Sequence, residues 1–437
     1  MRTPQSTGKR ENAFLVGFGL RRRPHVPGIE AETEARESIE ELAELAHSAG
    51  ANQAGRLIQI RDAADPATLF GSGKLEEIKR EAEAREATLV IVDASLTASQ
   101  QRNIEKAIAL PTIDRVQLIL DNFARHARSR EGQLQVELAQ LNYMLPRLAG
   151  RGIELSRLGG GIGTRGPGEQ KLETDRRRIR RRIAQLEGSL EAVRRERQMR
   201  RRARQGVPLA TVALVGYTNA GKSTLFNALT SASVTVSPRM FATLDPTVRG
   251  LRLPSKRRVL LSDTVGFIRD LPPGLVTAFR ATLEELQEAA LILHVIDISS
   301  PRHGEQQIQV DKVLADLDLE SRPRLRVYNK IDRLSQPQSA SWAGVTSGIF
   351  VSALTGAGLD HLIEEIDRQL PGDPIVQLHL RVPLADGRKI AAIRASGRVL
   401  ESHVHDSEVW MDVELPESAA RKLANHRARQ PARTAKP

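Results

Sequence analysis

The stretch that decides the fold is Leu209–Leu229, LATVALVGYTNAGKSTLFNAL. Its apolar, largely β-branched segment Val212–Val215 predicts a buried strand of a parallel sheet. The segment that follows, Gly216–Ser223, matches the pattern GxxxxGK[ST] in full. Apolar residues then recur at helical spacing, namely Leu225, Phe226, Ala228 and Leu229. A strand, a glycine-bounded loop and a helix in this order predict a phosphate-binding loop, whereas a chance loop is the weaker alternative.

The chemistry of such a loop follows from its backbone. Its N–H groups point inward at the first turn of a helix, where the helix dipole favours an anion. Lys222 adds a positive charge against the β- and γ-phosphates, and the Ser223 hydroxyl is placed to bind Mg²⁺. The sequence therefore predicts a nucleoside triphosphate site, with phosphate contacts from Gly216, Tyr217, Thr218, Asn219, Ala220, Gly221, Lys222 and Ser223.

A second motif selects the base. The apolar run Leu325–Val327 leads into an NKxD sequence that ends at Asp332. Its carboxylate can accept hydrogen bonds from the N1–H and the 2-amino group of guanine, whereas adenine would leave it unpaired. A strand over residues 349–351 brings further backbone groups toward the guanine O6. We therefore expect GTP and GDP as ligands, held at the base by Asn329, Lys330, Ile331, Asp332, Ser352, Ala353 and Leu354.

The catalytic segment is a DxxG motif, Asp263, Thr264, Val265 and Gly266, at the end of an apolar strand. We expect Asp263 to hold Mg²⁺ through water, and the Gly266 N–H to contact the γ-phosphate. The next residue is Phe267, whose ring cannot hydrogen-bond an attacking water. The sequence thus predicts slow intrinsic hydrolysis that a partner, a mobile loop or a bound ion accelerates.

Between these motifs lies the sequence FATLDPT, from Phe241 to Thr247. A GTPase needs a threonine here that senses the γ-phosphate through Mg²⁺, and both Thr243 and Thr247 have a suitable position. The nucleotide contacts expected from this segment are Phe241, Ala242, Thr243, Leu244 and Asp245.

The N-terminal part alternates strands with helices. Apolar runs over 13–18, 57–60 and 88–93 alternate with helical patterns over 29–49, 74–84 and 99–109, and the first of these helices is acidic. This alternation predicts a small β/α unit with a parallel sheet.

Two leucine-rich series then predict an antiparallel helical hairpin. The first runs from Leu134 to Leu148, with Pro146 expected to kink or end the helix, and the second from Leu172 to Val193. The connection 149–169 contains eight glycines, so we expect either a flexible linker or a thin tip that enters a crowded RNA cavity. From Arg176 to Arg204 there are thirteen arginines against three glutamates, which favours nucleic-acid contact over a merely solvated face.

Bulk composition sets the remaining limits. The chain has 437 residues, a net charge of +12, 3% aromatic residues and no cysteine. This length predicts about three domains, and the charge predicts a polyanionic partner contacted mainly through its phosphates. We expect an α/β protein in which 1–206 form the β/α domain with its hairpin, and 207–371 form a G domain with a mostly parallel sheet. Residues 372–437 would form a small β-rich domain with a disordered basic tail.

These motifs resemble those of the HflX family of GTPases, within the Obg–HflX group. The resemblance rests on GYTNAGKST, FATLDPT, DTVGF, NKID and SAL, and on LGGGIGTRGPGE ahead of the G domain. It covers about residues 12–371 and implies a GTPase that binds the large ribosomal subunit and its RNA and splits ribosomes under stress.

The resemblance also implies finer assignments. It gives the Mg²⁺-sensing role to Thr243 rather than Thr247, so that Ser223 and Thr243 are the metal ligands, and Lys222, Thr243 and Gly266 act in catalysis. It allows a K⁺ ion beside Asn219, and ATP at the N-terminal domain, for which the sequence shows no motif. We expect a monomeric cytoplasmic protein without a membrane span, part of which could associate with membranes.

Two other functions remain open. A GTP-regulated RNA-binding or remodelling factor that acts on non-ribosomal RNA would need the same phosphate contacts. A switch that acts at a membrane surface or on a protein scaffold is disfavoured, because the basic face is arginine-rich and lacks apolar residues for insertion.

Overall fold

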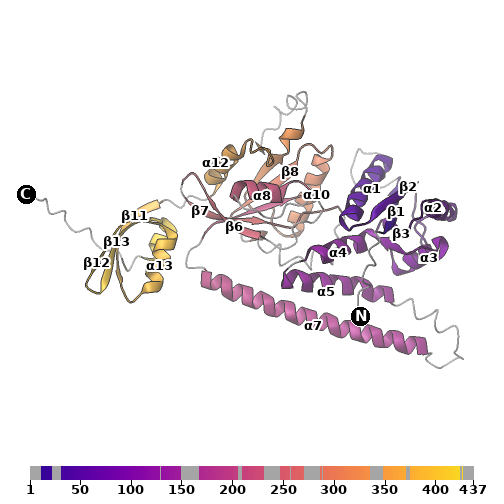
Figure 1. Ribbon diagram of the computed structural model, residues 1–437, viewed down its shortest axis with the longest axis horizontal. Helices are drawn as coiled ribbons and strands as arrows, with labels where there is room; N and C mark the ends of the chain where they lie inside the picture. The colour runs from indigo at the N-terminus through magenta and orange to yellow at the C-terminus, as the bar shows by residue number, and fades with distance from the viewer. Residues whose placement is uncertain are drawn as a thin grey trace, which may run out of the picture.

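The computed structural model describes residues 11–21, 31–127, 129–148, 167–204, 209–230, 247–255, 257–269, 286–287, 289–334, 348–370, 375–423 and 426. Three sheets follow one another along the chain, and each has its own helices (Figure 1). The expected α/β fold class is confirmed.

The first sheet is parallel and has the strand order β2-β1-β3-β4. Its two faces are covered by different helices, because inward and outward side chains alternate along each strand. Leu15 and Ile91 join the core formed with α1 and α4, whereas Phe14 and Val90 join the core under α2 and α3. The elements are β1 (Asn12–Leu20), α1 (Ala31–Ser48), β2 (Asn52–Arg61), α2 (Ser72–Ala84), β3 (Leu89–Asp93), α3 (Ala98–Ile108), β4 (Thr112–Asp114) and α4 (Arg115–His126).

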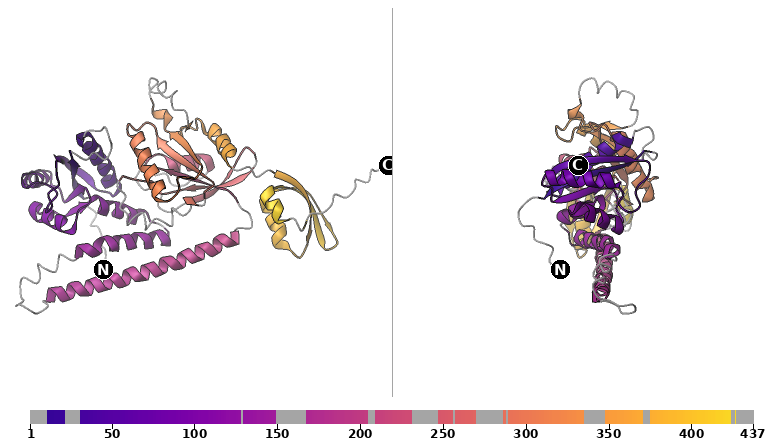
Figure 2. Two further views of the ribbon diagram at one scale, coloured as in Figure 1. Left: turned by 180° about the vertical axis from the view of Figure 1, so that it is seen from behind. Right: turned by 90° about the vertical axis from the view of Figure 1, so that its right-hand side faces the viewer.

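The helical hairpin consists of α5 (Arg130–Arg147) and α7 (Pro167–Arg204). Pro146 lies in the last turn of α5, and the helix ends one residue later, at Arg147. On α7 the expected apolar stripe faces inward, with Leu186 and Leu190 buried, whereas the leucines of α5 are half-buried. The residues that α5 buries are instead Gly132, Gln135, Val136 and Ala139, and α5 packs against both α4 and α7. Helix α7 runs beside α5 and continues well past it (Figures 1 and 2).

The central sheet has the order β10-β9-β8-β5-β7-β6, in which only the pairing of β6 with β7 is antiparallel. Because the other strands are parallel, their carboxyl ends share one edge of the sheet. The elements are β5 (Thr211–Gly216), α8 (Lys222–Thr230), β6 (Thr247–Arg252), β7 (Arg258–Asp263), β8 (Leu291–Asp297), α10 (His303–Asp316), β9 (Arg324–Asn329), a 3₁₀ turn (Ile331–Arg333), β10 (Ile349–Phe350) and α12 (Leu359–Gln369).

The C-terminal sheet is antiparallel, with the order β11-β13-β12. Burial alternates along its central strand, where Val409, Met411 and Val413 face the helix side and the residues between them are partly exposed. The elements are β11 (Ile375–Pro383), α13 (Gly387–Ser396), β12 (Arg398–His405), β13 (Glu408–Pro416) and α14 (Glu417–Lys422).

Several expectations lie outside the described residues. The proposed domain boundaries fall within 205–208 and 371–374, the glycine-rich connection falls almost wholly within 149–166, and most of the basic tail falls within 427–437. These expectations stay predictions.

Candidate nucleotide-binding site

Two glycines let the P-loop approach its neighbours closely. Gly216 ends β5 with φ +156°, and a Cβ there would lie 2.2 Å from the Val295 carbonyl oxygen on β8. Gly221 has φ +90°, and a Cβ there would lie 2.2 Å from the Asn329 side-chain nitrogen. Any side chain at either position would need the sheet or the NKxD segment to move, so the loop geometry requires glycine.

The loop is joined to the DxxG segment through backbone hydrogen bonds. The N–H of Thr218 donates to the Phe267 carbonyl at 2.7 Å, and the Phe267 N–H donates to the Gly216 carbonyl at 3.1 Å. Between them Gly266 lies so close that a Cβ would come 2.9 Å from the Lys222 Nζ. The structure thus brings together the lysine and the glycine that the sequence assigned to the γ-phosphate.

Lys222 is 6% exposed, and its Nζ donates to the carbonyls of Gly216 at 3.1 Å and Tyr217 at 2.9 Å. Burial lowers the pKa of Lys222 to about 8, although nearby Asp263 acts in the opposite direction. An anion placed in the loop would favour the charged amine and raise this pKa again.

Hard oxygen donors gather next to the lysine. The Ser223 hydroxyl donates to the Asp263 Oδ2 at 2.7 Å, and Asp263 is fully buried at the end of β7. A hydroxyl beside a carboxylate at the start of α8 fits Mg²⁺, which prefers oxygen ligands and retains several waters. The neighbouring Thr264 hydroxyl instead donates to the Leu214 carbonyl at 2.6 Å and so braces the sheet.

At the other end of the loop, Asn329 links three segments. Its amide nitrogen donates to the Ala220 carbonyl at 2.9 Å, and its Oδ1 accepts from the Ala353 N–H at 3.0 Å. The Asp332 carboxylate accepts from the Ser352 hydroxyl at 2.6 Å, which fixes the group expected to read guanine. The NKxD and SAL residues therefore converge on the P-loop, as their positions at strand ends predicted.

The remaining residues expected to contact the nucleotide have fewer fixed partners or greater exposure, or lie outside the described residues. Lys330 has φ +68° and pairs with Asp297 at 2.6 Å, and Leu354 is 77% exposed. Ile331 begins the 3₁₀ turn after β9, and Asn219 is exposed at the loop tip with φ +61°. The segment with Phe241, Ala242, Thr243, Leu244 and Asp245 lies outside the described residues, whereas Thr247 begins β6.

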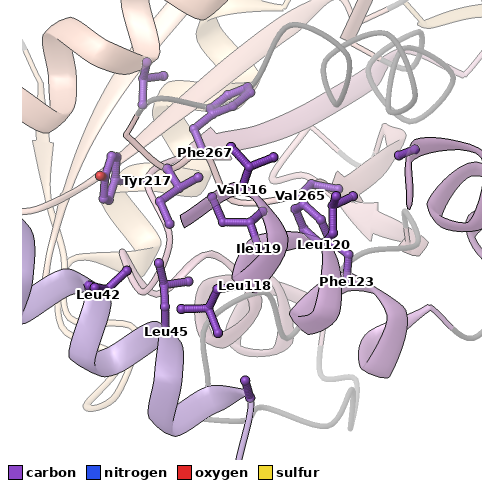
Figure 3. Packing of buried hydrophobic residues seen from close by; sticks show 14 of the residues in the cluster. Leu42, Leu45, Val116, Leu118, Ile119, Leu120, Phe123, Tyr217, Val265 and Phe267 are labelled. Carbon is purple, nitrogen blue, oxygen red and sulfur yellow. The ribbon is translucent and has the colours of Figure 1, made fainter. Parts of the chain in front are cut away.

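Sequence reasoning missed one feature of the site. Phe267 is 4% exposed, and its ring lies in a core shared by the G domain and the N-terminal domain. Figure 3 shows Phe267, Val265 and Tyr217 gathered with Leu42 of α1 and Val116 of α4. No local sequence pattern predicts this contact, because its partners are far apart in the sequence. An apolar residue directly after DxxG was the available signal.

The regions of the chain that match models of known protein families correspond to the N-terminal domain, the helical hairpin and the G domain. Residues 36–124, 126–204 and 211–330 match family models described as "GTP-binding GTPase N-terminal", "GTP-binding GTPase Middle Region" and "50S ribosome-binding GTPase". The chain is 48% identical over 397 residues to GTPase HflX of Caldanaerobacter subterraneus subsp. tengcongensis, covering 91% of this chain and 92% of that one. The chain belongs to the HflX family of GTPases. GTPase HflX of Escherichia coli is 44% identical, with 80% of this chain and 83% of the relative covered.

Among solved structures, a crystal structure titled "SsGBP and GDP complex" is similar to this HflX-family chain. It has a TM-score of 0.46 and 23% identity, and the match covers 83% of this chain and 98% of that one. Family membership establishes that this protein is a GTPase that binds guanine nucleotides. Among the described residues, no helix combines the length and the apolar character that a membrane crossing requires.

Proposed function

We propose that this HflX-family GTPase docks on the large ribosomal subunit in its GTP-bound state and separates ribosomal subunits under stress. The observation that carries the proposal is the charge of α7. The segment from Arg176 to Arg204 contains thirteen arginines and three glutamates, an excess of ten positive charges. Because such a helix repels itself unless anions neutralise it, an RNA surface is its natural partner.

The exposed arginines of α7 support this assignment. Arg178 and Arg181 are exposed, whereas Leu186 and Leu190 on the same helix are buried, and Arg182 pairs with Glu137 of α5 at 2.8 Å. One face of the helix is thus fixed to the N-terminal domain, and the other presents guanidinium groups. Phosphate contacts of this kind hold a protein on RNA without reading its sequence.

The nucleotide site would control this docking. Lys222 stabilises charge on the β- and γ-phosphates, and the Gly266 N–H donates to the γ-phosphate. Ser223 and Thr243 would hold Mg²⁺, which neutralises charge on the phosphates, while Asp332 selects guanine. Because the Phe267 ring is buried in the interdomain core, it orients no water, and the ribosome would supply that function.

The decisive experiment compares two pairs of arginines. We expect Arg178→Gln with Arg181→Gln to weaken binding to large ribosomal subunits about tenfold, because two phosphate contacts are lost. Arg80→Gln with Arg85→Gln, at two exposed arginines of which one lies within α2 and the other at its C-cap, removes the same charge and serves as the matched control. Co-sedimentation with large subunits at several salt concentrations measures both, and equal weakening by the two pairs would overturn the role of α7.

Three finer proposals remain. A K⁺ ion beside Asn219 and ATP bound by the N-terminal domain come from the family resemblance, and the third is a monomeric state. Turnover of GTP in KCl against NaCl tests the first of these, and sedimentation of the purified protein tests the last.

A further inference from the structure

The N-terminal domain contacts the G domain through acidic side chains of α1. Glu34 pairs with Arg269, which follows the DxxG segment, and Glu37 pairs with Arg302 at 3.1 Å. The third carboxylate, Glu41, accepts a hydrogen bond from the Tyr217 hydroxyl at 2.5 Å. Each G-domain partner lies on a segment that leaves the nucleotide edge of the sheet.

Tyr217 connects two of these segments within the G domain itself. It is the second residue of the P-loop, and its ring is 8% exposed in the shared core. Its hydroxyl accepts from the Arg269 backbone N–H at 2.8 Å while it donates to Glu41. One buried hydroxyl therefore joins the P-loop, the segment after DxxG and the N-terminal domain.

Glu41 is held in place from its other side. Its second carboxylate oxygen accepts from Arg115 at 2.7 Å, and Arg115 also pairs with Asp93 at the end of β3 at 2.7 Å. Arg115 is 4% exposed and Glu41 is 8% exposed. Because the buried Arg115 holds the other oxygen of this buried carboxylate, Glu41 cannot follow the tyrosine if the P-loop moves, so it acts as an anchor.

We propose that Tyr217 is a positioning residue: its hydroxyl, anchored by Glu41, holds the segment after DxxG so that the Gly266 N–H meets the γ-phosphate. This inference rests on the proposed contact of Gly266 with the γ-phosphate. Since GDP has no γ-phosphate, the arrangement favours GTP over GDP without a direct contact between the Tyr217 side chain and the nucleotide.

The test measures affinity for GDP and for the β,γ-imido analogue of GTP in the full-length protein. Tyr217→Phe keeps the ring in the shared core and removes only the hydroxyl. We expect it to weaken binding of the GTP analogue about tenfold and to change GDP affinity less than about twofold. Glu41→Gln should give the same selective loss, and the double variant should lose little more than either single variant, because both break one chain of hydrogen bonds.

Glu37→Gln is the matched control. It breaks another α1 contact with the G domain, at Arg302, and leaves the Tyr217 hydroxyl untouched, so both affinities should stay unchanged. The proposal is overturned if Tyr217→Phe leaves the ratio of the two affinities unchanged, weakens both ligands equally, or is matched by Glu37→Gln.

Gly266→Ala tests separately the contact of the Gly266 N–H with the γ-phosphate, on which the positioning role of Tyr217 rests. A Cβ there would come within 3.0 Å of Lys222 Nζ and Thr218, so the DxxG backbone would have to shift away from the γ-phosphate, and the GTP analogue should lose more affinity than GDP. If this variant binds the analogue normally, the γ-phosphate contact of Gly266 is wrong, and the positioning role fails with it. If it is selective but Tyr217→Phe is not, only the positioning role fails. Neither readout involves ribosomes.

Discussion

At the scale of single residues, Lys222 has a measurable protonation state. Its pKa of about 8 in the nucleotide-free protein means that it is half neutral at pH 8, whereas a bound phosphate requires the charged amine. We therefore expect GDP binding to take up about half a proton at pH 8 and little at pH 7. Because binding requires the protonated lysine, GDP affinity is also expected to fall as pH rises above 8.

Calorimetry in buffers of different ionisation enthalpy measures this proton uptake. Uptake that stays flat between pH 7 and 8.5 would contradict the buried, depressed lysine.

Asp332 tests base selection. Its carboxylate is oriented by the Ser352 hydroxyl, and Asp332→Asn replaces one acceptor by an amide that donates. We expect GDP affinity to fall about a hundredfold, because hydrogen bonds to a charged group are lost. Xanthosine diphosphate, whose C2 carbonyl accepts from that amide, should gain affinity.

Asp360→Asn removes an exposed carboxylate from α12 and is the matched control, with both nucleotides expected to bind as in the parent protein. Unchanged discrimination in the Asp332 variant would remove this residue from the guanine site.

At the scale of elements, local patterns predicted what local chemistry determines. The alternation of apolar runs and helical spacing located β1, β3 and their helices, because strand and helix periods are written in neighbouring residues. The P-loop, DxxG and NKxD motifs lie at one edge because they follow parallel strands. Even so, β2 begins at Asn52, five residues before the apolar run at Leu57, since sheet pairing with β1 extends it.

Such local patterns could not predict contacts between residues that are far apart in the sequence. Glu41 and Tyr217 are 176 positions apart, and Glu41 and Arg115 are 74 apart, so no spacing rule connects them. The acidic character of α1 was visible in the sequence, but it was equally compatible with a solvated face. The burial of Phe267 likewise depends on a second domain rather than on its neighbours.

The hairpin supplies a prediction at this scale. Replacement of 150–166 by a short polar linker keeps α5, α7 and the exposed arginines. If this connection is the tip that enters an RNA cavity, its replacement should abolish ribosome splitting and leave salt-dependent binding to generic RNA unchanged. Light scattering follows splitting, and filter binding follows RNA affinity. A parallel loss of both would favour the RNA-remodelling alternative.

At the scale of the whole molecule, the nucleotide site and the arginine-rich helix α7 belong to parts of the chain that are joined through one core. Tyr217, Val265 and Phe267 from the G domain pack with Leu45 and Ile119 from the N-terminal domain (Figure 3). Helix α7 packs against α5, which in turn packs against α4 of that domain. A change at the γ-phosphate therefore has a physical route to the basic helix. This arrangement explains why docking and hydrolysis would depend on each other.

The measurement that tests this account most directly is GTP turnover by the purified protein, alone and with large ribosomal subunits added. Small subunits and free structured RNA at equal nucleotide concentration are the controls. We expect slow turnover alone and an increase of about tenfold or more with large subunits only, since in the proposed mechanism the ribosome would supply the water-orienting function that buried Phe267 lacks. No stimulation by large subunits, or equal stimulation by free RNA, would contradict the account and support an RNA-remodelling factor instead.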